Sequence, residues 1–364
     1  MHSTKLLLIT SEFPPQPGGI GNHAHHVAQS LGAHRFVVTV LADQRSESGE
    51  DEAQFDANQE YTVKRVKRRT FLLFTYLKRM YLAIQLTKKQ DVILVSGKFS
   101  LWIAGLVRFF TSKKIVAVIH GSEVAIPPSL KQSFTKWCLR RCDTVIAISS
   151  FTASLVSNWN LKDIIIVPNG FSIPKSKPRE PDFTEPLQLI TVGNVTQRKG
   201  QHNIVQALPA LVARFPKLQY HIVGIPTEKE RVQELALQLG VQDHVIFHGK
   251  VSEEEKINML KQANVFVMLS ETTPEGDVEG FGIAILEANA LGLPAIGALG
   301  CGIEDAISDK NSGVLIDPKS PEQMLAAVTE ILENYHHYGQ AAKKWSQRFT
   351  WDKISKQYAK ILMP

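Results

Sequence analysis

Cysteine is scarce in this chain, with only three in 364 residues. Cys138, Cys142 and Cys301 match neither the ligand spacing of a zinc site nor the paired framework of a small disulfide-stabilised protein. The sequence therefore excludes both classes. Cysteine usage of this kind is typical of a reducing compartment, which predicts a cytoplasmic protein.

Long hydrophobic runs are also absent. No run approaches the roughly 18 apolar residues that a transmembrane helix needs. The first apolar run, at residues 6–9, is too short for a signal peptide, so we expect it to lie in a first strand over 5–10. An apolar content of 44% with 21% charged residues is typical of a globular protein.

Acidic residues are missing from the stretch 64–89, which holds nine Lys and Arg. Aromatic and aliphatic residues are interspersed among these cations. This composition suits a segment that docks peripherally on an anionic membrane surface. It suits equally a basic helix that packs its apolar side on its own domain. No nucleic-acid partner is expected, because the basic cluster is local and no recognised binding motif accompanies it.

The length of the chain exceeds one ordinary hydrophobic core, so two domains are expected. Four prolines in 173–186 predict a linker, with an amino-terminal domain at 1–172 and a carboxyl-terminal domain at 187–345. The net charge is +9 in 1–172 and −3 in the remainder, so the basic surplus belongs to the first half. Strands and helices alternate in both halves, which predicts two doubly wound α/β domains.

The first strand leads into a proline- and glycine-rich loop at 11–21, a helix and a second strand at 36–41. Gly19, Gly21, Ala24 and Asp43 fit a dinucleotide-binding fingerprint, which leaves an NAD-dependent oxidoreductase as an alternative. In that fingerprint the glycines follow the strand directly, whereas here a proline-rich stretch intervenes. A flexible loop facing a cleft and a plain turn are the other interpretations. The polar stretch 44–60 is expected to be a loop.

Histidines occur in two notable places. His23, His25 and His26 have no carboxylate or cysteine at ligand spacing, so we expect helix-surface histidines there rather than a metal site. His120 directly follows the strand expected at 114–119, where open α/β sheets place ligand-binding groups. A hydrogen-bonded structural histidine is the alternative for this position.

The stretch 274–288 carries two carboxylates, Glu279 and Glu287, separated by seven residues. Between them, Gly280, Phe281, Gly282 and Ile283 lead into an apolar run that predicts a buried helix. The unpaired N–H groups and positive dipole at such a helix start favour a phosphate. Carboxylates on either side suit diols, because they only accept hydrogen bonds and hydroxyls donate them. A ligand with sugar, diphosphate and ribose in a row satisfies all three features.

Two cations follow the first strand expected in the second domain. Gly193 ends that strand, and Arg198 and Lys199 come shortly after it. Arginine as a fork and lysine as a point charge could together hold a diphosphate. An isolated Arg-Lys-Gly sequence is also typical of a solvated loop.

The Glu-Gly-Phe-Gly-x3-Leu-Glu-Ala segment at 279–288 resembles the Glu-x7-Glu signature of retaining nucleotide-sugar glycosyltransferases of family 4. The resemblance extends over nearly the whole chain, most clearly over 271–305. It implies the GT-B fold, in which two Rossmann-like domains face each other across a cleft. The last helix, at 346–364, would then cross back to the first domain.

The resemblance also implies an activity, which is transfer of a hexose from a nucleotide diphosphate sugar to a hydroxyl of a glycan or lipid-linked glycan. By resemblance, Glu279 holds sugar hydroxyls, Glu287 the ribose diol, and His120 touches the sugar. The loop at Gly19 would lie against the donor phosphates and the acceptor, and 198–199 would bind the diphosphate. Asn194 departs from the family, which usually has arginine there.

The expected chemistry needs neither a cofactor nor a metal. Cations and backbone amides would stabilise the departing diphosphate, and the chain contains no Asp-x-Asp pair. The segment 277–279 resembles members that transfer mannose to lipid-linked acceptors, so the donor would be GDP-mannose or a UDP-sugar. A non-catalytic sugar-nucleotide-binding protein is a further alternative.

Overall fold

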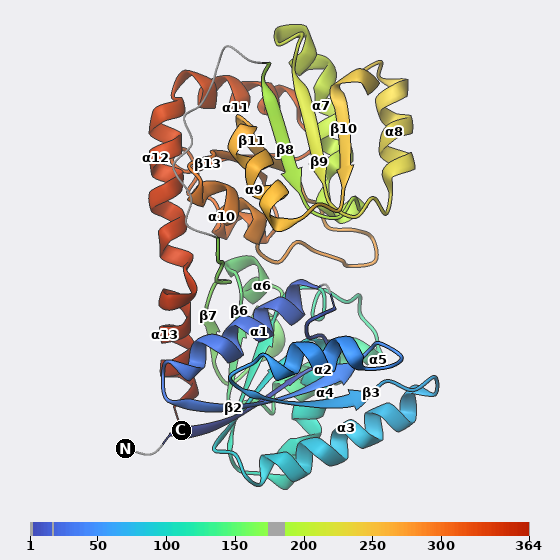
Figure 1. The fold of residues 1–364 in the computed structure, drawn as a ribbon, viewed down its shortest axis with the longest axis vertical. Helices are drawn as coiled ribbons and strands as arrows, with labels where there is room; N and C mark the ends of the chain where they lie inside the picture. The colour runs from blue at the N-terminus through green and yellow to red at the C-terminus, as the bar shows by residue number, and fades with distance from the viewer. Residues whose placement is uncertain (1–2, 17, 174–185, 364) are drawn as a thin grey trace. The chain divides into compact units, whose positions relative to one another are not determined.

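The computed structural model describes residues 3–16, 18–173 and 186–363, and it divides into two compact units. Unit 1 comprises Met1–Gly170 and Trp351–Pro364, and unit 2 comprises Phe171–Thr350. Each unit is a parallel sheet with helices on both faces (Figure 1). Most of the expected linker, 174–185, lies outside the described residues.

Unit 1 is built on a seven-stranded parallel sheet with the order β3-β2-β1-β4-β5-β6-β7. Its strands are β1 Thr4–Thr10, β2 Phe36–Gln44, β3 Thr62–Lys67, β4 Val92–Ser96, β5 Lys114–Ile119, β6 Thr144–Ala147 and β7 Ile164–Ile166. The central strands are continuous apolar runs buried on both faces, as expected where helices cover both sides of a parallel sheet.

In unit 1 the chain adds β2 and β3 on one side of β1 and then continues with β4 on the other side. This change of direction determines which face of the sheet each helix covers. Because crossovers between parallel strands are right-handed, helices before the reversal cover one face and those after it cover the other. The first face carries α1 Gly19–Gly32 and α2 Glu50–Ala57. The second carries α3 Leu72–Thr87, α4 Lys98–Val107 with the 3₁₀ turn η1 Arg108–Phe110, α5 Leu130–Leu139 and α6 Ser150–Ser154.

One sequence expectation for unit 1 is wrong, and one is right only in part. The stretch 44–60 contains helix α2 where a loop is expected, and the acidic first turn of α2 complements the helix dipole. The basic stretch 64–89 contains the helix α3, but it starts within an edge strand, β3. A charged edge strand has little apolar alternation, so its period-2 signal is weak, and cations are typical of exposed sheet edges.

Unit 2 is built on a six-stranded parallel sheet with the order β10-β9-β8-β11-β12-β13. Its strands are β8 Gln188–Val192, β9 Gln219–Val223, β10 Val245–Gly249, β11 Val265–Met268, β12 Ala295–Ala298 and β13 Gly313–Ile316. Its helices are α7 Gln201–Arg214, α8 Lys229–Gln238, α9 Glu253–Gln262, α10 Ile283–Ala290, α11 Pro321–Glu333 and α12 Tyr335–Ser346. One apolar core joins the sheet to α7, α8 and α11.

The last helix, α13 Trp351–Leu362, belongs to unit 1 although the chain reaches it from unit 2. It packs on α1 through a buried face of Trp351, Ile354, Tyr358 and Leu362. These buried residues recur every three or four positions, as they do on one side of an amphipathic helix. No helix among the described residues is long and apolar enough to cross a membrane.

Candidate active site

The site in unit 2 is organised around the start of α10. Gly282 precedes the helix with φ +92°, a left-handed conformation that side chains rarely adopt, and no side chain caps the helix start. The turn before it fits closely against a neighbouring loop, because a Cβ on Gly302 would lie 2.0 Å from the Gly280 carbonyl oxygen. Phe281 is buried and packs on Phe349, so its backbone and not its ring is available to a ligand.

Two cations converge on one carboxylate beside this turn. The Lys199 Nζ lies 2.7 Å from Glu279 Oε2, and the Arg198 guanidinium donates to the same oxygen. A second nitrogen of Arg198 donates to Asp277 at 3.0 Å. The structure therefore brings the adjacent cations Arg198 and Lys199 to Glu279, about 80 positions further along the chain and directly before the 280–283 turn.

The electrostatics of Glu279 follow from these contacts. Its burial opposes ionisation, but the charges and hydrogen bonds of Lys199 and Arg198 outweigh burial and hold its pKa below the usual value. Glu279 is therefore an anion at neutral pH and presents acceptor oxygens within a cationic site. A buried carboxylate of this kind needs its partners, since a lone buried charge is strongly unfavourable.

Glycines allow the cations to reach this position. Gly193 directly follows β8, and a Cβ on it would lie 3.3 Å from the Lys199 side chain, which passes directly over it. Gly200 has φ +71° and approaches the Leu269 carbonyl so closely that a Cβ would lie 1.7 Å from its oxygen. Both glycines lie beside the carboxyl ends of strands, where open α/β sheets bind ligands.

Glu287 lies in the second turn of α10 and pairs with Lys256 of α9, whose Nζ is 3.0 Å from Oε2. Burial raises the pKa of Glu287 more than the lysine lowers it. The two predicted carboxylates therefore have different environments. Glu279 is surrounded by the predicted cations, while Glu287 has a cation from a neighbouring helix.

Sequence reasoning missed Lys256 and Asp277 as members of this site. Lys256 follows the capping box that Ser252 and Glu255 form at the start of α9, and no motif marks its role. Asp277 had a usable signal, since it stands two residues before Glu279 and both carboxylates meet Arg198. Asn194 contributes its backbone carbonyl, which accepts a hydrogen bond from Gln201.

The remaining predicted residues, His120 and Gly19, lie in unit 1. His120 follows β5, and its Nε2 is 2.9 Å from the Ser96 hydroxyl at the end of β4. Burial lowers its pKa to about 4, so the imidazole is neutral at pH 7. Its backbone N–H donates to the buried carboxyl of Glu123 at 2.8 Å, which fixes the loop that carries it. Gly19 is the first residue of α1.

The histidines of α1 do not form a metal site among the described residues. The expectation of surface histidines is wrong for His23, which is 2% exposed and whose Nε2 lies 3.0 Å from the Tyr358 hydroxyl. Its ring also packs edge-on against His120. His25 bonds the Tyr61 hydroxyl at 2.6 Å, and His26 stacks on Trp351. All three serve packing around α1.

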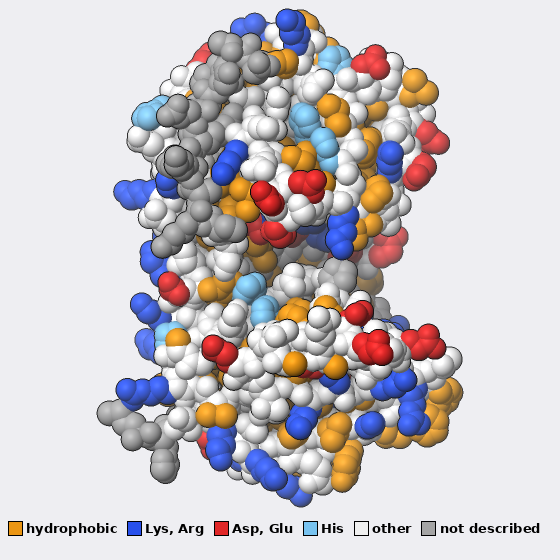
Figure 2. Space-filling model, in the orientation of Figure 1, with side chains coloured by type: hydrophobic (Ala, Val, Ile, Leu, Met, Phe, Trp, Pro, Cys, Tyr) orange, Lys and Arg blue, Asp and Glu red, His pale blue; other side chains and the backbone are white. Residues whose placement is uncertain are grey.

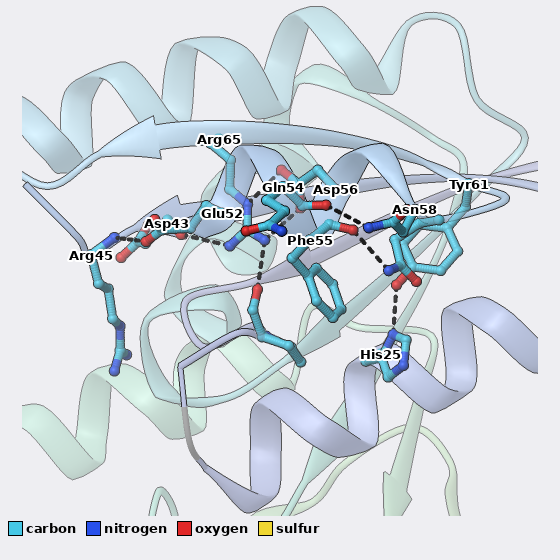
Figure 3. A network of polar contacts seen from close by, with 12 residues as sticks. His25, Asp43, Arg45, Glu52, Gln54, Phe55, Asp56, Asn58, Tyr61 and Arg65 are labelled. Carbon is cyan, nitrogen blue, oxygen red and sulfur yellow. Dashed lines mark hydrogen bonds and ion pairs between the residues drawn. The ribbon is translucent and has the colours of Figure 1, made fainter. Parts of the chain in front are cut away.

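Asp43, the acid of the alternative dinucleotide fingerprint, is buried in an ion pair with Arg79 of α3. Its backbone carbonyl accepts a hydrogen bond from Arg65, which also donates hydrogen bonds to Asp56 and to the Pro14 carbonyl (Figure 3). Asp43 and Arg65 thus belong to a network that joins β2, β3, α2 and the loop before α1. Because Asp43 is buried and already paired with Arg79, it is not available to bind a ribose hydroxyl.

Two family models match the chain. Residues 17–173 match "Glycosyltransferase Family 4" and residues 172–347 match "Glycosyl transferases group 1". The chain belongs to glycosyltransferase family 4. It is therefore a glycosyltransferase of a retaining family that takes sugar from a nucleotide sugar, and the oxidoreductase alternative is wrong.

Similar proteins agree with this assignment. A Mycobacterium tuberculosis protein described as a GDP-mannose-dependent α-(1-6)-phosphatidylinositol monomannoside mannosyltransferase is 28% identical, and the match covers 99% of this chain and 98% of that one. Sucrose-phosphate synthase from Thermosynechococcus elongatus has a similar structure, with a TM-score of 0.78 at 19% identity over 98% of both chains. Anabaena HepE in complex with UDP and glucose gives 0.77 at 19% over 99% of both. These likenesses show the GT-B fold.

Proposed function

We propose that this enzyme transfers a hexose from a nucleotide diphosphate sugar to a hydroxyl of a glycan or lipid-linked glycan, without a metal. The observation that carries the proposal is the meeting of Arg198, Lys199 and Glu279 beside the amides that start α10. Cations and unpaired N–H groups suit a diphosphate, and a buried anion next to them suits sugar hydroxyls.

In the proposed reaction the bond between the anomeric carbon and the diphosphate oxygen breaks, and a bond to the acceptor oxygen forms on the same face. Negative charge develops on the leaving diphosphate, where Arg198, Lys199 and the amides of 280–283 stabilise it. The acceptor hydroxyl gives its proton to the leaving phosphate, so no side chain needs to act as nucleophile. Glu279 holds the sugar hydroxyls during this step.

The other predicted residues have binding roles in this proposal. Glu287 accepts hydrogen bonds from the ribose diol, and Lys256 keeps its buried carboxylate oriented. His120 contributes a neutral imidazole to the sugar. The loop at Gly19 lies against the donor phosphates and the acceptor, and its conformation is supported by Arg65 through the Pro14 carbonyl.

For the donor we propose GDP-mannose, with a UDP-sugar as the competing choice. The relatives described as GDP-mannose-dependent match nearly the whole chain at 27–28% identity, and they act on a phosphatidylinositol mannoside. A lipid-linked acceptor would place the enzyme at the inner face of the membrane. The basic stretch 64–89 supports this placement, because helix α3 within it exposes apolar side chains beside cations.

The test is release of nucleoside diphosphate from a panel of GDP- and UDP-sugars, with a glycolipid extract as acceptor and with EDTA present. We expect turnover with GDP-mannose that the chelator does not reduce. Tight donor binding by calorimetry without nucleoside diphosphate release would instead indicate a non-catalytic protein. Release only with a UDP-sugar would keep the transfer reaction and overturn the donor assignment.

A further inference from the structure

Helix α3 has one face packed on the sheet and another left open. Its buried side repeats every fourth residue at Thr75, Arg79, Ala83 and Thr87. The opposite side exposes more than half of each of five large apolar side chains, which are Phe71, Leu73, Phe74, Leu77 and Tyr81. Helix α3 therefore packs on its own domain and also presents an exposed apolar stripe, and contact of this stripe with a membrane stays a prediction.

A second exposed apolar cluster lies on the next two helices of the same sheet face. Phe109 and Phe110 follow α4 and are 62% and 64% exposed. Leu130 and Phe134 belong to α5, and Leu130 is 90% exposed. None of these residues lies in the stretch 64–89, and sequence analysis did not single them out.

A chain of aromatic rings links α3 to the second cluster. Adjacent rings along it have centroids 5.3–6.1 Å apart, in the order Tyr76, Phe99, Trp102, Phe134, Trp137 and Phe109. It begins on α3, crosses α4 and ends at α5 and the turn after α4. Contact distances of this kind are those of packed aromatic pairs, so half-buried rings hold the three helices together beneath the exposed side chains.

Charge on this part of the chain is strongly one-sided. Residues 64–142 hold 17 Lys and Arg against two acids, Asp91 and Glu123. Three of these cations, Arg65, Arg79 and Arg108, pair with acids outside the stretch, which leaves 14 against the two acids within it. Arg141 lies over the rings of both Phe109 and Trp137. In Figure 2 hydrophobic and basic side chains gather at the right-hand edge over α3.

We propose that α3, the α4–η1 end and α5 form a single face that docks on an anionic phospholipid bilayer, with Phe110 and Leu130 entering it beside the α3 stripe. Aliphatic and aromatic side chains insert at the level of the headgroups, and the surrounding cations bind anionic lipid. A second copy of this chain fits poorly, since two such faces would repel each other. A nucleic acid would leave the exposed leucines in water.

The experiment is sedimentation of the full chain with vesicles of phosphatidylcholine containing 30% phosphatidylglycerol, against phosphatidylcholine alone. One variant combines Phe110→Ser with Leu130→Ser, and a second combines Leu73→Ser with Leu77→Ser. The control is Leu237→Ser, which removes a 66% exposed leucine from α8 in unit 2. Circular dichroism and the melting temperature verify that each variant is folded.

We expect binding to the anionic vesicles to fall roughly tenfold in each double variant, to be unchanged in the control, and to weaken steeply with salt. Wild-type binding by the Phe110/Leu130 variant would overturn the proposal, as would equal binding to both vesicle types. Concentration-dependent dimerisation that both double variants abolish would assign the face to a second copy. Binding to duplex or single-stranded polynucleotides with no vesicle binding would assign it to nucleic acid.

The proposal deepens the membrane placement given above, and its failure is separable from failure of the glycosyl transfer. Hydrolysis of the donor without vesicles, followed as release of nucleoside diphosphate, measures the donor site and does not involve the docking face. We expect both double variants to keep this release at the wild-type rate. A variant that loses vesicle binding but still releases nucleoside diphosphate at the wild-type rate is therefore impaired only in docking.

Discussion

The two units are both parallel sheets, but the side chains at the carboxyl ends of their strands differ in charge. In unit 2 these side chains are charged, with Arg198 and Lys199 beside Glu279. In unit 1 burial keeps them neutral, since His23 packs against His120 and both imidazole pKa values are lowered. Glu123 beside them has its pKa raised to about 7, again chiefly by burial.

Under the proposed function, this difference matches two kinds of ligand. A diphosphate carries charge, so fixed cations suit it, and a neighbouring carboxylate balances those cations. A sugar or an acceptor hydroxyl is neutral, so neutral donors and acceptors suit it without the cost of removing water from an ion. The predictions below test this contrast between the edges.

The largest effect is expected from Lys199→Ala. Loss of a cation at the leaving diphosphate should lower turnover about a thousandfold, roughly 4 kcal/mol in activation free energy. The melting temperature should also fall, because the buried Glu279 carboxylate loses one of its two cationic partners. Steady-state release of nucleoside diphosphate measures it. The matched control is Lys310→Ala, which removes a surface lysine paired with Glu330 in the same unit and should leave turnover unchanged. Near-normal activity in Lys199→Ala would show that Lys199 does not stabilise the leaving diphosphate.

Gly200→Ala should destabilise the protein by about 3 kcal/mol, because its Cβ would collide with the Leu269 carbonyl at the edge of unit 2. Gly240→Ala is the control, since that glycine has a similar φ of +68° and open space around it. It should cost only about 1 kcal/mol. Urea unfolding of both variants measures the difference, and equal costs would mean that the close approach at Gly200 is unimportant.

Glu123 and Glu279 should contribute to stability with opposite pH dependence. The pKa of Glu123 is raised, so unfolding releases its proton between about pH 4.5 and 7, and its contribution to stability falls as pH rises through this window. From pH 5 to 7.5 this contribution should fall by about 2 kcal/mol. The lowered pKa values of His23 and His120 act in the opposite direction, so the measure is the difference in unfolding free energy between the wild type and Glu123→Gln in urea titrations. A difference that stays constant over this range would show that Glu123 does not titrate there.

For Glu279 the sign is reversed. Its pKa is lowered, so its contribution is fully present above the ordinary carboxyl pKa and is lost as pH falls through the depressed value. Glu279→Gln should therefore reduce stability at neutral pH and differ little from the wild type at strongly acidic pH. An equal deficit at both extremes would show that hydrogen bonding rather than charge gives Glu279 its effect.

The smallest effect is expected from Tyr358→Phe, which removes the hydroxyl that α13 places 3.0 Å from His23. A single buried hydrogen bond contributes about 1 kcal/mol, and the free energy of unfolding should fall by that amount. Tyr81→Phe, on the exposed side of α3, should change stability by far less. If the two variants are alike, α13 does not support the histidine cluster through this contact.

Much of the fold could be predicted from the sequence. Apolar runs such as 92–96 and 265–268 are buried on both faces, and their length and composition alone identify strands. Helix α2 and strand β3 could not be identified in this way, because half of the residues in each are charged. Glu52 and Arg65 anchor them through backbone groups outside their own elements. Periodicity does not record such contacts.

The sequence by itself determined the alternation of strands and helices, the charge difference between the halves, and the spacing of Glu279 from the helix start. These properties are local, since they depend on residues a few positions apart. Only the tertiary structure decided that Arg198 and Lys199 share one oxygen of Glu279, that Lys256 faces Glu287, and that rings from three helices pack on one another. Such contacts depend on the strand order of each sheet, which brings segments that are distant in sequence close together.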